Sequence, residues 1–285
     1  MALSSRHPDV PKNVFLMIGA MKSGTTSLFE DIVSHPQVHE PTVKEPEDLT
    51  SDAVLSEPGL SRYLKIFSGA PEGAWCGEAS TAYTKLPEYS GAAERAKIIF
   101  GPDVKLVFIG RDPVSRLRSH YRHEVAKGTL SGSLAEALVR FPALRDVSRY
   151  DRQLAPWRKT FGDKALLVLQ YSDYVANPRA VVERVWAHLG LDPAGLDAGA
   201  HRNASAGKRV PKGIVRSFVQ SDFYARGIRT LLPYRLRQWV KALLVPKGQK
   251  QFADTLSPDA EATLRAELSA ACRDFEALAS RSAGD

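Results

Sequence analysis

Residues 14–27 read Val14-Phe-Leu-Met-Ile18-Gly19-Ala-Met-Lys22-Ser23-Gly24-Thr25-Thr26-Ser27. The uninterrupted apolar run at 14–18 is typical of a strand buried on both faces of a parallel sheet. A loop at 19–24 follows, and then apolar residues at helical spacing, which are Leu28, Phe29, Ile32 and Val33. In such a turn, backbone N–H groups converge with the positive end of the helix dipole. The stretch therefore predicts an anion-binding loop. The alternative is a Gly-rich turn that binds nothing.

The position of the lysine limits which anion this loop would bind. A Walker A loop has the pattern Gly-x4-Gly-Lys-Ser/Thr, with its lysine directly after the second glycine. Gly19 and Gly24 have that spacing, but Thr25 follows Gly24 and the lysine is Lys22. A lysine inside the loop can instead contact the bridging oxygen between a 5′-phosphate and its leaving group. The alternative function for such a loop is that of a P-loop kinase, which uses ATP and Mg²⁺. A kinase would need an acid at a strand end to hold Mg²⁺, and Asp112 is the nearest candidate.

The strand signal returns further along the chain. Apolar runs at 105–109 and 165–169 predict two more buried strands, and 74–79 is a weaker candidate. Helices are expected to follow at 113–127, from Pro178 to about residue 189, and from Ser257 onward. Strands that alternate with helices predict an α/β fold. We expect a P-loop-like parallel sheet flanked by helices, with a helical C-terminal region.

Composition places the chain among ordinary globular proteins. It has 285 residues, of which 44% are hydrophobic and 25% charged, and a net charge of +7. Its two cysteines exclude a disulfide scaffold or a Cys-rich zinc module. No apolar run reaches the roughly 18 residues of a membrane span, and the first 13 residues lack the apolar core of a secretory signal. We therefore expect a cytoplasmic protein.

A second motif follows the 105–109 run and makes a family resemblance visible. It reads Ile109-Gly-Arg111-Asp-Pro113, with Ser119 eight residues after the arginine. With the loop at 22–27, this pair of motifs resembles the PAPS-dependent sulfotransferase family, in its bacterial and heparan-sulfate-type branch. PAPS is 3′-phosphoadenosine 5′-phosphosulfate. The resemblance implies a single domain over 1–285, with a nucleotide-binding α/β core at 13–215 and a helical part at 216–285.

Three further segments extend the resemblance, and two positions depart from it. The matching segments are Lys44-Glu45-Pro46, Glu78-Ala-Ser-Thr-Ala-Tyr83, and His201-Arg-Asn203-Ala-Ser205 with Lys208-Arg209. Heparan-type members commonly have a lysine where this chain has Ala79, and an aromatic pair where it has Glu47-Asp48-Leu49. Both departures lie on the acceptor side. They weaken the assignment of a polysaccharide as acceptor more than the assignment of PAPS as donor.

The resemblance also implies roles for individual residues. The loop would hold the 5′-phosphosulfate through Lys22, Ser23, Gly24, Thr25, Thr26 and Ser27. Arg111 and Ser119 would bind the 3′-phosphate, and Lys208 and Arg209 would close over the nucleotide. Lys22 would also stabilise the leaving phosphate, and Glu45 would accept the proton of the attacking hydroxyl. His39 and Glu78 are the alternative bases. No metal is expected.

The acceptor and the partners are less defined. A carbohydrate, a glycolipid or another small molecule with a hydroxyl group is compatible with the donor site. Residues 201–250 hold twelve Lys/Arg and one acid, Asp222, which indicates an anionic partner. Within this segment, 223–250 could lie on a membrane surface as a basic binding module, or could bury its apolar face on the domain. No nucleic-acid motif accompanies the charge, and the oligomeric state is open.

Overall fold

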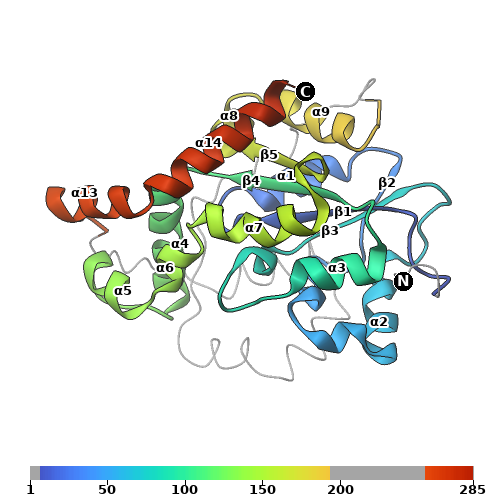
Figure 1. Ribbon diagram of the computed structural model, residues 1–285, viewed down its shortest axis with the longest axis horizontal. Helices are drawn as coiled ribbons and strands as arrows, with labels where there is room; N and C mark the ends of the chain where they lie inside the picture. Colours follow the sequence, from blue (N-terminus) through green and yellow to red (C-terminus); the bar gives the residue numbers. More distant parts are fainter. Residues whose placement is uncertain (1–6, 193–253, 285) are drawn as a thin grey trace, which may run out of the picture. The chain divides into compact units, whose positions relative to one another are not determined.

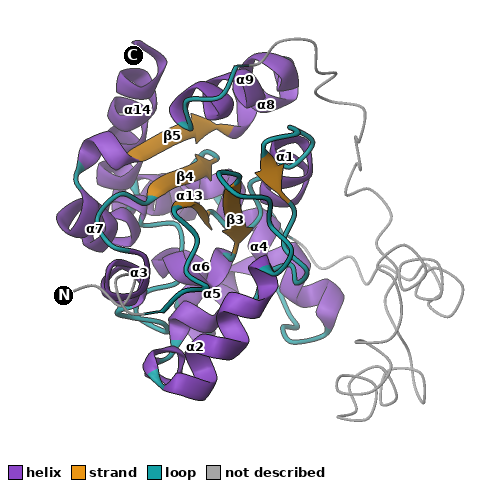
Figure 2. Ribbon diagram, turned by 90° about the vertical axis from the view of Figure 1, so that its right-hand side faces the viewer, coloured by secondary structure: helices purple, strands orange, loops and turns teal. Residues whose placement is uncertain are grey.

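The computed structural model describes residues 7–192 and 254–284. A five-stranded parallel sheet has the order β2-β3-β1-β4-β5 (Figures 1 and 2). Its strands are β1 (Asn13–Gly19), β2 (Val38–His39), β3 (Trp75–Ala79), β4 (Lys105–Gly110) and β5 (Leu166–Gln170). The three strands predicted from apolar runs and the weaker candidate are all confirmed. β2 has only two residues, too few for a periodic signal.

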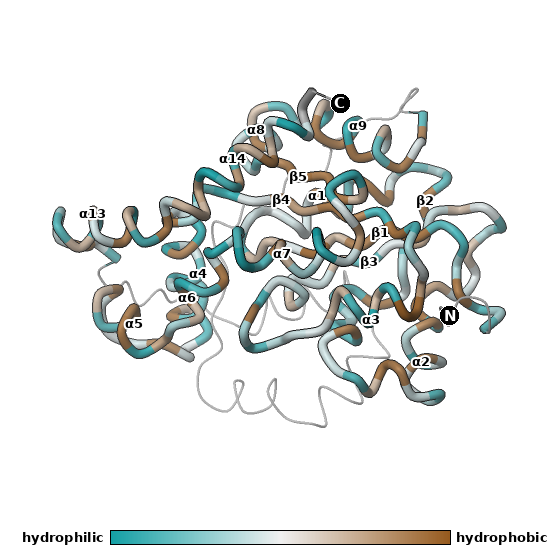
Figure 3. The backbone as a smooth tube through the Cα atoms, viewed as in Figure 1, coloured by the Kyte–Doolittle hydropathy of each residue, from teal (hydrophilic) through white to brown (hydrophobic). Residues whose placement is uncertain are grey.

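Alternation along β1 divides the apolar core into two layers. Leu16 and Ile18 face one layer and Phe15 and Met17 the other, because successive side chains of a strand point to opposite faces. All four are fully buried, and the strands are among the most hydrophobic parts of the chain in Figure 3. Both faces are covered, which explains why the run is continuous rather than alternating.

Helices cover both faces of the sheet (Figure 1). One face packs on α1 (Thr25–Ile32) and α9 (Pro178–His188), with α8 (Tyr171–Ala176) beside them. The other face packs on four helices, which are α2 (Glu57–Leu64), α3 (Ala92–Phe100), α7 (Tyr150–Phe161) and α14 (Ser269–Gly284). The remaining α-helices within the described residues are α4 (Pro113–Lys127), α5 (Leu134–Arg140), α6 (Ala143–Asp146) and α13 (Pro258–Glu267).

Local signals account for several helix ends. Side-chain oxygens of Asn177 and Ser257 accept hydrogen bonds from the first turns of α9 and α13, and a proline follows each cap. The helix expected from Ser257 onward is two helices, because Leu268 leaves helical geometry (φ −94°, ψ 2°) between α13 and α14. The two helices nevertheless bury one apolar face, with Leu264, Leu268, Phe275 and Leu278 all buried.

The described residues belong to two compact units. The larger contains the whole sheet and consists of 7–120, 138–192 and 256–284; the smaller has 121–137 and 254–255. Inside the smaller unit, the Tyr121 hydroxyl donates to the carbonyl of Gly132 (2.6 Å), and Arg122 pairs with Asp254. All described candidate site residues lie in the larger unit. Lys208, Arg209, the 201–205 motif and the basic segment 223–250 lie outside the described residues.

Candidate active site

The predicted anion loop connects β1 to α1 at the carboxyl end of the sheet. The N–H of Ala20 donates to the carbonyl of Ile109 on β4 (2.8 Å), which fixes the start of the loop. Lys22 (φ 71°) and Gly24 (φ 83°) then adopt left-handed backbone conformations. Within the described residues no side chain caps the N-terminus of α1. The first N–H groups of that helix are therefore available to a ligand.

Ser23 gives an independent indication that the loop is built for a ligand. Its side chain is fully buried, and its Oγ has no hydrogen-bond partner of ordinary geometry among the described residues. It lies close enough to the Tyr150 hydroxyl for a weak hydrogen bond that lowers the pKa of Tyr150, against the larger effect of burial. A buried polar atom left without a partner is costly, so an anion held by the loop fits this position. Around it, Thr25 is buried, Ser27 is half-buried and Thr26 is exposed.

The second predicted motif follows β4. The Tyr150 hydroxyl donates to the carbonyl of Arg111 (3.0 Å) and lies 3.3 Å from its backbone nitrogen, so the backbone of Arg111 is held from α7. Burial raises the pKa of Tyr150, which keeps that hydroxyl protonated. Arg111 and Ser119 are both half-buried, with Ser119 two turns along α4. Asp112, the acid of the kinase alternative, accepts from the N–H of Ser115 (2.8 Å) and so caps α4.

Tyr171, at the start of α8, joins the two motifs. The guanidinium carbon of Arg111 lies 5.5 Å from the centre of its ring, within cation–π range. A Cβ at position 24 would come within 2.7 Å of the same ring. The structure therefore brings the anion loop and Arg111 together around one aromatic side chain. Tyr171 is not among the residues predicted from the sequence; the available signal was an aromatic residue two positions after a predicted strand.

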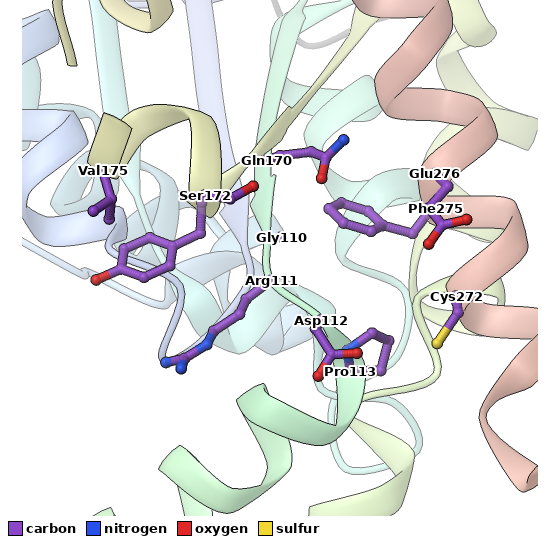
Figure 4. A pocket seen from close by; sticks show the side chains of 11 residues that line it. Gly110, Arg111, Asp112, Pro113, Gln170, Ser172, Val175, Cys272, Phe275 and Glu276 are labelled. Carbon is purple, nitrogen blue, oxygen red and sulfur yellow. The ribbon is translucent and has the colours of Figure 1, made fainter. Parts of the chain in front are cut away.

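A cavity of about 490 Å³ adjoins Arg111 (Figure 4). It lies where β4 and β5 end, with Arg111 and Val175 on one side and Cys272, Phe275 and Glu276 of α14 on the other. Residues 20–24 are not part of its lining. The cavity therefore extends the site from Arg111 toward α14 rather than over Lys22.

The predicted base lies in the segment 40–47, between β2 and the helical turn Asp48–Thr50. Glu45 is exposed, and its φ of 52° places it in the left-handed region, as does the φ of 59° at Glu47. Lys44 pairs with Glu30 of α1 (3.5 Å), so this segment is tied to the helix that begins at the anion loop. His39, an alternative base, ends β2; its Nε2 is buried without a hydrogen bond from any described residue.

Glu78, the other alternative base, has a different environment. It is fully buried on β3, and its carboxylate accepts hydrogen bonds from three hydroxyl groups, those of Tyr63, Ser80 and Tyr83. Burial raises its pKa to about 7, although the three hydrogen bonds act in the opposite direction. With both oxygens already accepting hydrogen bonds and no exposed surface, Glu78 does not face a substrate in this structure.

Comparison with known proteins assigns the family. The sulfotransferase family model matches residues 40–194, more than half of the chain. This range contains the Lys44, Glu78 and Arg111 motifs and begins after the anion loop. Among curated relatives, heparan sulfate glucosamine 3-O-sulfotransferase 6 of Mus musculus is 27% identical over 212 residues, which cover 67% of this chain and 56% of the relative. Carbohydrate sulfotransferase 15 of Mus musculus is 24% identical over 245 residues, covering 63% and 44%.

A solved structure is also similar. The sulfotransferase of Alicyclobacillus acidocaldarius superposes with a TM-score of 0.57 and 25% sequence identity, over 68% of this chain and 87% of that one. The chain spans about half the length of the curated relatives it matches. From the anion loop, the second motif and these similarities together, the chain belongs to the sulfotransferase family.

Proposed function

We propose that the protein transfers a sulfuryl group from PAPS to a hydroxyl group of a carbohydrate, a glycolipid or another small molecule, by in-line displacement. The observation that carries this proposal is that the anion loop, with its uncapped α1 N-terminus and buried Ser23 hydroxyl, meets Arg111 at the ring of Tyr171, which Gly24 and Arg111 both approach. A 5′-phosphosulfate fits the first two groups, and a 3′-phosphate fits the guanidinium. PAPS supplies the activated sulfuryl group.

The chain's own residues divide the work on the donor. Lys22 and the N–H groups of Thr25 and Thr26 stabilise the charge that builds on the leaving phosphate. Arg111 presents a fork of donors to the 3′-phosphate, and Ser119 adds a short hydroxyl donor. Lys208 and Arg209 complete the nucleotide contacts in this proposal. A sulfuryl group carries less charge than a phosphoryl group, so these donors suffice for its transfer.

The acceptor hydroxyl must lose its proton as it attacks, and we assign that proton to Glu45. Its exposure and its tie to α1 through Lys44 and Glu30 support this choice over the buried Glu78. The left-handed conformation at Glu45 is of the kind that is retained at functional sites.

Nucleotide binding tests the donor assignment. We expect the protein to bind 3′-phosphoadenosine 5′-phosphate, without Mg²⁺, at least tenfold more tightly than adenosine 5′-phosphate or ATP. Titration calorimetry with the three nucleotides measures this. Equal affinity for the compound that lacks the 3′-phosphate would refute the role of Arg111 and Ser119.

Turnover tests the base. Glu45→Gln keeps the shape of the side chain and removes its basicity, so we expect turnover to fall roughly a hundredfold. Nucleotide affinity should stay unchanged. The control is Glu40→Gln, which alters another exposed glutamate of the same segment. If His39→Ala abolished turnover while Glu45→Gln did not, the base would be His39.

The proposal extends to location and surface contacts. A cytoplasmic protein agrees with Cys76 and Cys272, which form no disulfide. Among the described residues, no helix is long and apolar enough to cross a membrane. We also propose that residues 223–250 make a peripheral contact with a membrane surface, rather than burying their apolar face on the domain. Vesicle flotation with anionic and neutral lipids, for the whole chain and for a chain without 223–250, tests it.

A further inference from the structure

We propose that Glu78 is a positioning residue: its buried carboxylate orients the Ser80 hydroxyl, and Ser80 in turn holds the backbone of the segment that carries Glu45. This inference rests on the function proposed above, because Glu45 is the base in that proposal. Glu78 itself touches no reacting atom.

The hydrogen bonds are donated in one direction, from the segment to the sheet. Ser80 Oγ donates to Glu78 Oε2 (2.7 Å), and the backbone N–H of Glu47 donates to Ser80 Oγ (3.1 Å). A hydroxyl group has one proton. Because Ser80 donates that proton in its hydrogen bond to the carboxylate, only the lone pairs of Ser80 Oγ remain, and these accept from the N–H of Glu47. Ser80 is itself fixed, since it is fully buried and its N–H donates to the carbonyl of Met17 (3.2 Å).

The backbone conformation of this segment requires stabilisation by the surrounding structure. Glu45 and Glu47 both have positive φ values, and non-glycine residues keep this conformation only where the surrounding structure imposes it. At Glu47, the hydroxyl of Thr50 donates to the carbonyl (2.6 Å) while Ser80 accepts from the N–H. Both backbone polar groups of Glu47 are therefore fixed, two residues from the side chain of Glu45.

Burying a carboxylate costs desolvation free energy, and fixing one serine would not require it. This cost favours a functional reason for Glu78. The groups that face it are the hydroxyls of Tyr63 from α2, of Tyr83 from the turn Thr81–Thr84, and of Ser80, with Asp48 acting on it electrostatically. Both tyrosines have pKa values raised well above the usual range by burial, so they stay protonated. Glu78, with a pKa of about 7, is the member of this cluster that changes charge near neutral pH.

Ser80→Ala is the central test, because it breaks the link and leaves Glu78 in place. We expect turnover to fall at least tenfold, affinity for 3′-phosphoadenosine 5′-phosphate to stay within twofold, and amide hydrogen exchange in peptides covering 44–50 to accelerate. Ser80→Thr, which keeps the hydroxyl, should restore both turnover and protection. Ser148→Ala is the matched control: it removes a hydroxyl from another fully buried serine and should leave exchange at 44–50 unchanged.

The pH dependence separates positioning from simple structural support. Protonating Glu78 weakens it as the acceptor for Ser80, so exchange at 44–50, corrected for its intrinsic rate, should rise in the wild type as pH falls through about 7. In Ser80→Ala and Glu78→Gln this pH-dependent step should be absent.

Each contrary result identifies what fails. Unchanged exchange at 44–50 in Ser80→Ala overturns the inference, and so does faster exchange with unchanged turnover. Absence of sulfuryl transfer by the wild type would refute the proposed function instead, while the exchange comparison would still decide whether Glu78 and Ser80 hold this segment.

Discussion

At the scale of single residues, Lys22 and Arg111 are proposed to contact opposite ends of the donor. Substitutions of these two residues should therefore have different effects on turnover and on nucleotide affinity. In the proposed mechanism, the bond from Lys22 strengthens only as the leaving phosphate gains charge, whereas Arg111 binds the 3′-phosphate equally before and during transfer. The two side chains thus separate rate from affinity.

Substitution should reveal that difference. Arg111→Ala should weaken binding of 3′-phosphoadenosine 5′-phosphate by roughly 2–3 kcal/mol, as for a lost charged hydrogen-bonded pair. Lys22→Ala should lower turnover strongly with a smaller change in affinity. Single-turnover kinetics and calorimetry measure the two effects, with Lys12→Ala, an exposed lysine ahead of β1, as the control. If Lys22→Ala raised only the Michaelis constant for the donor, Lys22 would not act in the transition state.

At the scale of elements, the β1–loop–α1 unit depends on α8 through Gly24. Any side chain at this position meets the ring of Tyr171, and the φ of 83° disfavours side chains in addition. Gly69 has the same φ of 83°, but a Cβ there would meet no other atom within 4 Å, so it isolates the conformational effect from the steric one.

Substitution of Gly69 and of Gly24 by alanine should reduce folding stability by different amounts. Gly69→Ala should cost about 1 kcal/mol of folding stability, from backbone conformation alone, and should leave nucleotide binding intact. Gly24→Ala should cost a further 1–3 kcal/mol, roughly the penalty of overpacking, and reduce affinity for 3′-phosphoadenosine 5′-phosphate at least tenfold. Denaturant unfolding and calorimetry on both variants test this. Equal losses in the two variants would show that the Tyr171 contact is unimportant.

These elements also show what local sequence can predict. β1, β4 and β5 were predictable because continuous apolar runs require burial on both faces, and α4 and α9 because a proline marks the first turn. The burial of Glu78 was not predictable, since its three hydroxyl partners come from α2 and from the chain after β3. Tyr171 likewise becomes part of the site only when α8 packs against the loop before α1.

At the scale of the whole molecule, two buried groups give stability opposite dependences on pH. The pKa of Glu78 is raised to about 7, so its contribution is complete below about pH 4.5 and is lost as pH rises toward 7. Burial, and then Lys105, lower the pKa of His188 to about 4. The contribution of His188 is therefore complete above pH 6.5 and is lost as pH falls through 4.

Variants should separate the two dependences. Between pH 4.5 and 7 the Glu78 contribution to the free energy of unfolding should decline by about 3 kcal/mol, and Glu78→Gln should remove this decline. His188→Gln should remove part of the loss on the acid side. Urea unfolding at about pH 4, 5, 6 and 7 measures both. A wild-type and Glu78→Gln pair with parallel pH profiles would mean that Glu78 does not titrate in this range.

The packing of α14 has a consequence for how the protein is made. The ring of Phe275 lies 5.2 Å from that of Tyr150, whose hydroxyl holds the backbone of Arg111. A nascent chain on the ribosome can therefore complete β1, β4, α7 and β5 and still lack the Phe275 ring that packs beside Tyr150, the residue that holds the backbone of the arginine proposed to bind the 3′-phosphate. Competence to bind the donor would arise only after α14 has been synthesised, so partly translated chains should not sequester the nucleotide.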